Sequence, residues 1–142
     1  MKNRIISFDL GKKTLGVAIS DFLGITARGI ETFRFNENNY DKAVNRALEI
    51  INNENVNDIV IGYPLNMDGT ISKMAINVLS FKEKLLKLKP SLNIILIDER
   101  LSTISANRNL IETNLSAKKR KKIIDMEAAI IILEMYLEKT KK

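Results

Sequence analysis

The stretch RIISFDLGKKTLGVAISD, residues 4–21, decides the fold, because it holds two apolar runs, a tight turn and one acid between them. Arg4–Asp9 and Leu15–Asp21 are typical of β-strands, and the glycine in LGKKT suits the short turn of a hairpin. Asp9 stands where the first run ends. A solvated turn would explain this carboxylate, and so would an acid held at the end of a strand for chemistry.

The composition predicts a single domain, residues 1–142, of ordinary globular type. The chain is 45% hydrophobic and 28% charged. Its longest apolar run, AAIIIL at 128–133, is far shorter than the ~20 residues that cross a bilayer. The N-terminus has no apolar region of signal-peptide length. We therefore expect a cytoplasmic protein with no membrane partner.

The chain contains no cysteine and no histidine. This excludes disulfides, thiolate zinc sites, histidine general bases and imidazole metal ligands. Carboxylate and carbonyl oxygens remain as metal ligands, and such ligands suit Mg²⁺ or Mn²⁺.

The net charge of +6 is concentrated near the C-terminus. The block KKRKK at 118–122, with Lys139, Lys141 and Lys142, supplies eight of the 23 basic residues, and the other 15 are outnumbered by 17 acids. A local excess of this kind favours a face that binds polyanions. The charge pattern alone is equally consistent with a solvated loop and a frayed C-terminal end.

Periodicity and turn residues predict five strands and four helices. The helix at Tyr40–Asn52 has an apolar stripe of Ala43, Ala47, Leu48 and Ile51, and that at Ile71–Leu88 has one of Ile76, Leu79 and Leu86. The remaining expected elements are strands at Ile25–Phe35, Asp58–Pro64 and Asn93–Glu99, and helices at Ser102–Thr113 and Ile123–Lys139.

This element order predicts an α/β fold with one mixed sheet and helices on both faces. Right-handed crossovers place strands four and five beside strand one and parallel to it, which gives the order 3-2-1-4-5 with strand 2 antiparallel. Strand five, Asn93–Glu99, is apolar on both faces, which by itself predicts a central, parallel strand. Asp9, Asp98 and Glu99 end parallel strands and are expected at one rim.

Asp125 is the remaining candidate acid. It shares one face of the last helix with Ala129, Ile132 and Tyr136, so we expect it to point toward the protein. Carboxylates gathered at one place repel one another unless cations hold them or some are protonated. Two Mg²⁺ ions about 4 Å apart would relieve the repulsion and clamp a phosphodiester for attack by water. Taken singly, each acid is also explained as a turn or helix-start residue.

Four motifs resemble one family. ISFDLGKKTLGVAISD, IVIGYPLNMDGT, DERLST and IIDMEAAIIILEMYLE are similar, in this order, to motifs of the YqgF-type family of small bacterial nucleases. That family is similar to Holliday-junction resolvases of the RuvC kind and has an RNase H-like fold. The resemblance implies that Asp9, Glu99 and Asp125 are catalytic, and that these three with Asp98 hold Mg²⁺ or Mn²⁺.

The resemblance also implies a function. It indicates a metal-dependent nuclease that helps to trim the 5′ end of the small-subunit ribosomal RNA precursor. Cleavage of four-way DNA junctions and a non-catalytic RNA-binding assembly factor stay open as alternatives, as does a weak homodimer. DLG followed by a polar turn also resembles the phosphate-binding hairpin of actin-like ATPases, but those need two such domains, which this length does not supply.

Several polar residues are candidate nucleic-acid contacts, each with a structural alternative. The two lysines after Gly11 could neutralise phosphate or simply face water, and Asn66 could contact RNA or only shape the NMDG turn. The block at 118–122 is expected to be flexible, as the resemblance implies. The candidates are Lys12, Lys13, Asn66, Arg100, Lys118, Lys119, Arg120, Lys121 and Lys122.

Overall fold

The structure is a computed structural model that describes residues 3–98 and 117–140, with the backbone alone for residues 117–126. Glu99, Arg100 and the helix predicted at Ser102–Thr113 lie outside the described residues. The described elements are β1 Ile5–Leu10, β2 Thr14–Ser20, β3 Ala27–Arg34, α1 Tyr40–Glu54, β4 Asp58–Tyr63, α2 Lys73–Leu88, β5 Asn93–Asp98 and α4 Ala117–Thr140.

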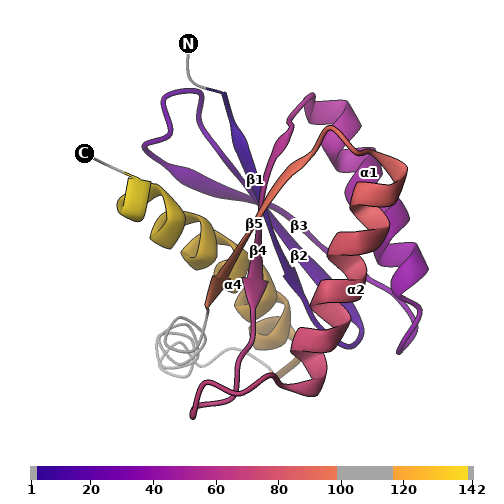
Figure 1. Ribbon diagram of the computed structural model, residues 1–142. Helices are drawn as coiled ribbons and strands as arrows, with labels where there is room; N and C mark the ends of the chain where they lie inside the picture. The colour runs from indigo at the N-terminus through magenta and orange to yellow at the C-terminus, as the bar shows by residue number, and fades with distance from the viewer. Residues whose placement is uncertain (1–2, 99–116, 141–142) are drawn as a thin grey trace.

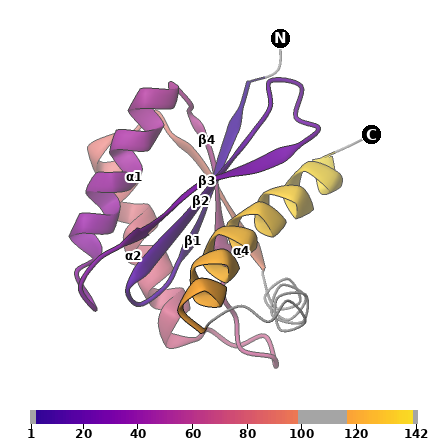
Figure 2. The ribbon, with the colours of Figure 1, turned by 180° about the vertical axis from the view of Figure 1, so that it is seen from behind.

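The sheet confirms the predicted topology. Its five strands run in the order β3-β2-β1-β4-β5. β2 is antiparallel to both of its neighbours, whereas β1, β4 and β5 are parallel to one another. Helices α1 and α2 cover one face and α4 lies across the other, as both views show (Figures 1 and 2). In the part of the chain that the structure describes, no helix is long and apolar enough to cross a membrane.

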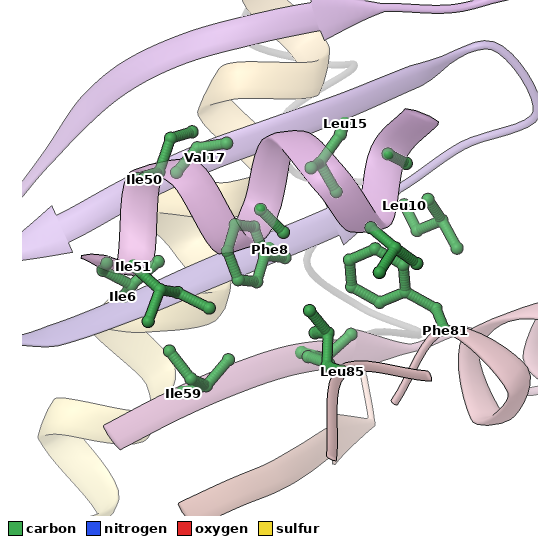
Figure 3. Packing of buried hydrophobic residues seen from close by; sticks show 14 of the residues in the cluster. Ile6, Phe8, Leu10, Leu15, Val17, Ile50, Ile51, Ile59, Phe81 and Leu85 are labelled. Carbon is green, nitrogen blue, oxygen red and sulfur yellow. The ribbon is translucent and has the colours of Figure 1, made fainter. Parts of the chain in front are cut away.

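The main core lies between the sheet and the pair α1 and α2. Period-two alternation turns every second residue of β1 and β2 toward these helices. Phe8 meets Phe81 of α2 edge to face, with ring centroids 5.9 Å apart. The predicted stripe of α1 is confirmed, because Ala43, Ala47 and Ile51 are buried. Figure 3 shows the packing of Ile6, Phe8, Leu10, Leu15, Val17, Ile50, Ile51, Ile59, Phe81 and Leu85.

Small residues line the other face, where α4 packs. Gly16 and Ala18 of β2 are buried there, and Ala129 of α4 is fully buried in one cluster with Ala18. Ser7 of β1 donates a hydrogen bond from its Oγ to the carbonyl oxygen of Ala129 at 2.6 Å. The helix therefore packs close to the sheet at this point.

β5 is an edge strand whose two faces are both covered. Ile94 and Leu96 pack against the main core, whereas Ile95 and Ile97 pack on the α4 side with Ile132. The prediction of a central position is therefore wrong, because helices on both faces give an edge strand the same apolar pattern.

The predicted stripe of α2 is wrong at Ile76 and Leu79, whereas Leu86 does pack against the main core. Ser72 caps this helix, accepting a hydrogen bond from the N–H of Ala75 at 3.0 Å. Ile76 is 59% exposed and Leu79 is 36% exposed. The true stripe is one residue out of phase with the prediction, which followed the bulkier side chains. It consists of Ala75, Val78, Phe81 and Leu85.

The predicted start of the last helix is also wrong. α4 begins at Ala117, so Lys118–Lys122 have helical backbone and do not form a segment before the helix. The prediction started at the first apolar residue, Ile123, although Lys and Arg are themselves good helix formers.

Candidate active site

Asp9 and Asp98 lie at the same edge of the sheet. β1 and β4 are parallel with Phe8 beside Ile61, and β4 and β5 are parallel with Tyr63 beside Asp98. Asp9, the next-to-last residue of β1, therefore lies one residue before the level at which β4 and β5 end. Two strand spacings of ~4.8 Å separate the backbones of the two acids. The topology thus brings two predicted site residues to one rim.

The two acids nevertheless lie on opposite faces. Asp9 is partly buried and alternates with Phe8 of the main core, so it shares the α4 face with Ser7. Asp98 is exposed and follows Ile97, which packs on the α4 side. Alternation places Asp98 on the α1–α2 side. The sheet therefore does not bring these two carboxylates together on one face.

The register of α4 places the backbone of Asp125 near Asp9. Ala129 lies over Ser7, and Leu133 and Leu137 pack with the cluster that Ile5 contacts. α4 therefore runs antiparallel to β1. Asp125 lies four residues, or ~6 Å, before Ala129 along α4, and Asp9 lies two residues, or ~6.6 Å, after Ser7 along β1. Because the helix and the strand are antiparallel, both steps lead toward the same end of the sheet. Figures 1 and 2 show α4 beginning at the end toward which β4 and β5 point.

Asp9 is the first member of a row across three strands. It pairs with Gly16 of β2, and Gly16 pairs with Thr32 of β3. All three share the α4 face, and Gly16 leaves room between its neighbours because it has no side chain. Ser7, Gly16 and Thr32 were not predicted as parts of this region, because only the strand register relates them to Asp9.

The turn between β1 and β2 fixes two candidate lysines at the same edge. The N–H of Gly11 donates to the carbonyl of Thr14 at 2.7 Å. A Cβ at Gly11 would lie 2.9 Å from Thr14 Oγ1, so any other residue here would force the buried Thr14 side chain to shift. Lys12 and Lys13 follow, both exposed. Their side chains can therefore reach a ligand at this rim.

Asn66 lies in the loop after β4, again at the carboxyl edge. Its Nδ2 donates to Thr70 Oγ1 at 3.0 Å, and its N–H donates to the Thr70 carbonyl at 2.9 Å. Asp68 accepts from the N–H and the hydroxyl of Thr70, and Gly69 has φ +89°. The side chain of Asn66 therefore holds the loop together, which supports the structural alternative for this residue.

Only part of the predicted carboxylate set lies within the described side chains. Among the described side chains there is no group of three or more acids that could hold a metal ion. Glu99 and Arg100 lie outside the described residues, and only the backbone is described at Asp125 and at Lys118–Lys122. Asp9 and the backbone of Asp125 are the part of the predicted site that the structure brings together.

Comparison with known proteins decides the family. A family model described as "RuvX: Holliday junction resolvase" matches residues 3–139. The chain belongs to the RuvX family. This confirms the family resemblance of the four motifs, and RuvX membership makes the chain a hydrolase of the nuclease type.

Relatives from two staphylococci match nearly the whole chain. Proteins of Staphylococcus carnosus (strain TM300) and Staphylococcus aureus (strain JH9), each named "Putative pre-16S rRNA nuclease", are 44% identical to it over 138 residues. The matches cover 97% of this chain and 97% of each relative.

Solved resolvase structures share the fold of the RuvX chain. The fowlpox virus Holliday junction resolvase has a TM-score of 0.61 at 15% identity, covering 96% of this chain and 99% of that one. Thermus thermophilus RuvC has a TM-score of 0.59 at 11% identity, covering 96% and 95%. These likenesses confirm the predicted RNase H-like architecture.

Proposed function

We propose that this chain hydrolyses phosphodiester bonds at the carboxyl edge of β1, using a divalent cation held by Asp9, Glu99 and Asp125. The observation that supports this most directly is the placement of Asp9. It is partly buried on the α4 face, and the hydrogen bond from Ser7 to Ala129 fixes the helix that carries Asp125.

The residues at this edge fit Mg²⁺ or Mn²⁺ by their chemistry. Asp9 offers carboxylate oxygens, and the sequence has no thiol or imidazole to select a softer metal. A bound cation supplies a Lewis acid that lowers the pKa of water and offsets charge on the phosphate. Asp9 and Asp125 would approach it from the sheet and from the helix. Their mutual repulsion in the empty state would favour its binding.

The acid from β5 is proposed to be Glu99, with Asp98 in a lesser role. Ile95 and Ile97 pack on the α4 side, and alternation continued by two residues assigns position 99 to that same side. Asp98 belongs to the opposite side. It could assist by its charge but is poorly placed to share a cation with Asp9.

The proposed substrate is the precursor of 16S ribosomal RNA, cut near the 5′ end of the mature sequence. The names of relatives 44% identical over nearly their whole length support it. Lys12, Lys13, Arg100 and the block Lys118–Lys122 would contact phosphates, and Asn66 would contribute mainly by shaping its loop. Residues 1–142 would act as one domain in the cytoplasm.

Four-way DNA is the second candidate, because the matching family model is described as a Holliday junction resolvase. A resolvase must cut two symmetry-related strands, so it normally works as a dimer. A weak homodimer of this chain would meet that need. A non-catalytic RNA-binding assembly factor is the remaining alternative.

The test compares both substrates at equal salt and metal. Purified protein is incubated with end-labelled RNA spanning the 16S 5′ junction, or with a labelled four-way junction, with Mg²⁺, with Mn²⁺ or with chelator. We expect metal-dependent RNA cleavage that Asp9→Asn abolishes without loss of fold.

Three outcomes would overturn parts of the proposal. Symmetric junction nicking faster than any RNA cleavage would favour the resolvase. Near-normal cleavage by folded Asp9→Asn would remove the carboxylate site. RNA binding without cleavage under any metal would favour the assembly factor.

A further inference from the structure

Two of the four arginines whose side chains are described make no ion pair with another described residue. Arg4 pairs with Glu54 at 3.0 Å, and Arg46 pairs with Glu31 at 2.5 Å. Arg28 and Arg34 are both exposed and both belong to β3. They lie at opposite ends of this strand, so one is near Asp9 and the other is remote from it.

Strand register places Arg34 on the same face as Asp9. Arg34 pairs with Thr14, and Thr32, two residues earlier in β3, pairs with Gly16, the partner of Asp9. Two strand spacings of ~4.8 Å and two residues of ~3.3 Å separate the backbones of Arg34 and Asp9, which is about 12 Å. Arg34 therefore lies at the carboxyl edge, outside the row that contains the acid.

The β1–β2 turn lies between the two positions and carries two exposed lysines, Lys12 and Lys13. The carbonyl of Lys13 accepts from the N–H of Phe35 at 2.9 Å, and that of Lys12 accepts from Asn38 at 3.4 Å. These bonds tie the turn to the chain that follows Arg34. Lys12, Lys13 and Arg34 thus form one corner of the molecule, which we call the β3 corner.

The acids nearest to Arg34 in sequence do not pair with it. Glu31 pairs with Arg46 of α1, and among the described residues no ion pair joins Glu37 to Arg34. Arg34 can therefore bind a ligand without giving up an ion pair with a described residue.

We propose that Arg34 binds a backbone phosphate of the substrate strand, away from the bond that is cut. The strand then passes from Asp9 across Lys12 and Lys13 to the end of β3. A guanidinium suits this task because its planar fork can hold two phosphate oxygens at once. A fixed cation there also offsets the repulsion between the site carboxylates and a polyanion. This inference rests on the proposed function, since it needs a nucleic-acid strand at Asp9.

The test compares Arg34→Gln with Arg28→Gln as a matched control. Binding of a labelled single-stranded oligouridylate is measured by anisotropy in chelator over a range of salt. Arg34→Gln is expected to lower affinity about tenfold and to reduce the salt slope by ~0.7. Arg28→Gln should leave both unchanged. Arg34→Lys should keep the slope and lose part of the affinity, because the charge remains but the fork does not.

Truncated substrates test the direction of the strand. If Arg34 contacts one side of the cleaved bond, shortening the RNA from that side should remove the difference between wild type and Arg34→Gln. Shortening from the other side should preserve it. In cleavage assays Arg34→Gln should raise KM several-fold with kcat nearly unchanged.

The failures of this inference and of the proposed function are distinct. Equal binding by Arg34→Gln and Arg28→Gln, with wild type binding normally, overturns the role of Arg34 alone. Absence of binding by wild type overturns both. Binding that depends on Arg34, without cleavage under any metal, leaves the β3 corner in place and overturns the nuclease proposal.

Discussion

The buried hydroxyl of Ser7 relates the sheet to the helix that carries Asp125. Its Oγ donates to a carbonyl oxygen that belongs to the interior of α4, and the side chain is fully buried. A larger residue here would have to push the helix away from β1. The residue therefore sets both the stability of this interface and the separation of two candidate ligands.

Substitutions of Ser7 should separate these two effects. Ser7→Ala should lower the free energy of unfolding by about 1 kcal/mol, the typical net value of one hydrogen bond. Ser7→Val should cost ~1–3 kcal/mol through overpacking and should also slow cleavage. Urea denaturation and cleavage rates provide the measurements, with the exposed Ser80→Ala in α2 as control. Equal cleavage by folded Ser7→Val and Ser7→Ala would contradict the role of helix position.

Asp98 and Glu99 differ in the face to which the strand pattern assigns them. Glu99→Gln should reduce cleavage by more than ~100-fold, in the range of an acid–base or ligand loss. Asp98→Asn should reduce it by less than about tenfold, since Asp98 is exposed on the side away from Asp9. Single-turnover cleavage of labelled RNA measures both. The reverse order of severity would show that Asp98 is the ligand from β5.

The face of Asp98 could not be predicted from the sequence. Between Asn93 and Asp98 the strand is apolar at all four positions, IILI, so no polar residue inside it marks one face as solvated. The rim itself was predictable, because Asp9 and Asp98 each end an apolar run and parallel strands end together. The β3 corner was missed for a related reason: only register places Arg34 beside Lys13.

Among the elements, the strands were easier to predict than the phase and ends of the helices. Glycine turns and alternating runs defined β1 and β2 to within about one residue. In α2 the exposed Ile76 and Leu79 outweighed the small Ala75 in the sequence pattern, although Ala75 is the residue that fits against the sheet. The size of an apolar side chain is therefore a poor predictor of its burial where a helix packs close to its neighbours.

The β2–β3 hairpin should be sensitive to acid. The N–H of Ile25 donates to Asp21 Oδ1 at 2.7 Å and lowers the pKa of that carboxyl below its ordinary value of 3.8. A depressed pKa stabilises the fold above pH 3.8, and this contribution is lost as the pH falls through the folded-state pKa. Asp21→Asn should therefore be less stable than wild type at pH 7, with the gap closing below pH 3.8 in urea titrations. A gap independent of pH would show that the charge of Asp21 contributes nothing.

Because the basic block Lys118–Lys122 belongs to α4, its charges affect the stability of that helix. Five cations begin α4, and its first turn holds no acid. Positive charge near a helix N-terminus opposes the macrodipole. A bound polyanion would relieve this opposition. The block is therefore better explained by a ligand than by the stability of α4 itself.

Replacing Lys118–Lys122 by Gln tests that explanation, since Gln keeps helix propensity. Binding should weaken similarly for different RNA sequences, and each lost phosphate contact should reduce the salt slope by ~0.7–0.9. Thermal stability of the free protein should stay the same or rise, because the unfavourable charges are gone. An unchanged salt slope would mean that the block is merely solvated.

At the scale of the whole molecule, the two ends of the sheet differ in character. The carboxyl edge carries Asp9 and the β3 corner. The β2–β3 hairpin at the opposite end exposes Phe22, Leu23 and Ile25, each more than half accessible. The proposed hydrolysis and strand binding are thus assigned to one end of the sheet, and each copy of the chain has one such edge.

This arrangement predicts how cleavage depends on protein concentration. Hydrolysis of single-stranded RNA needs only one edge, so its rate per protein molecule should stay constant as the protein is diluted. Symmetric nicking of a four-way junction needs two matched sites, so it should fall steeply once a weak homodimer dissociates. Sedimentation velocity at each assay concentration would identify the species present. RNA cleavage that vanishes together with the dimer would contradict a self-sufficient edge, and would mean that a second copy completes the site.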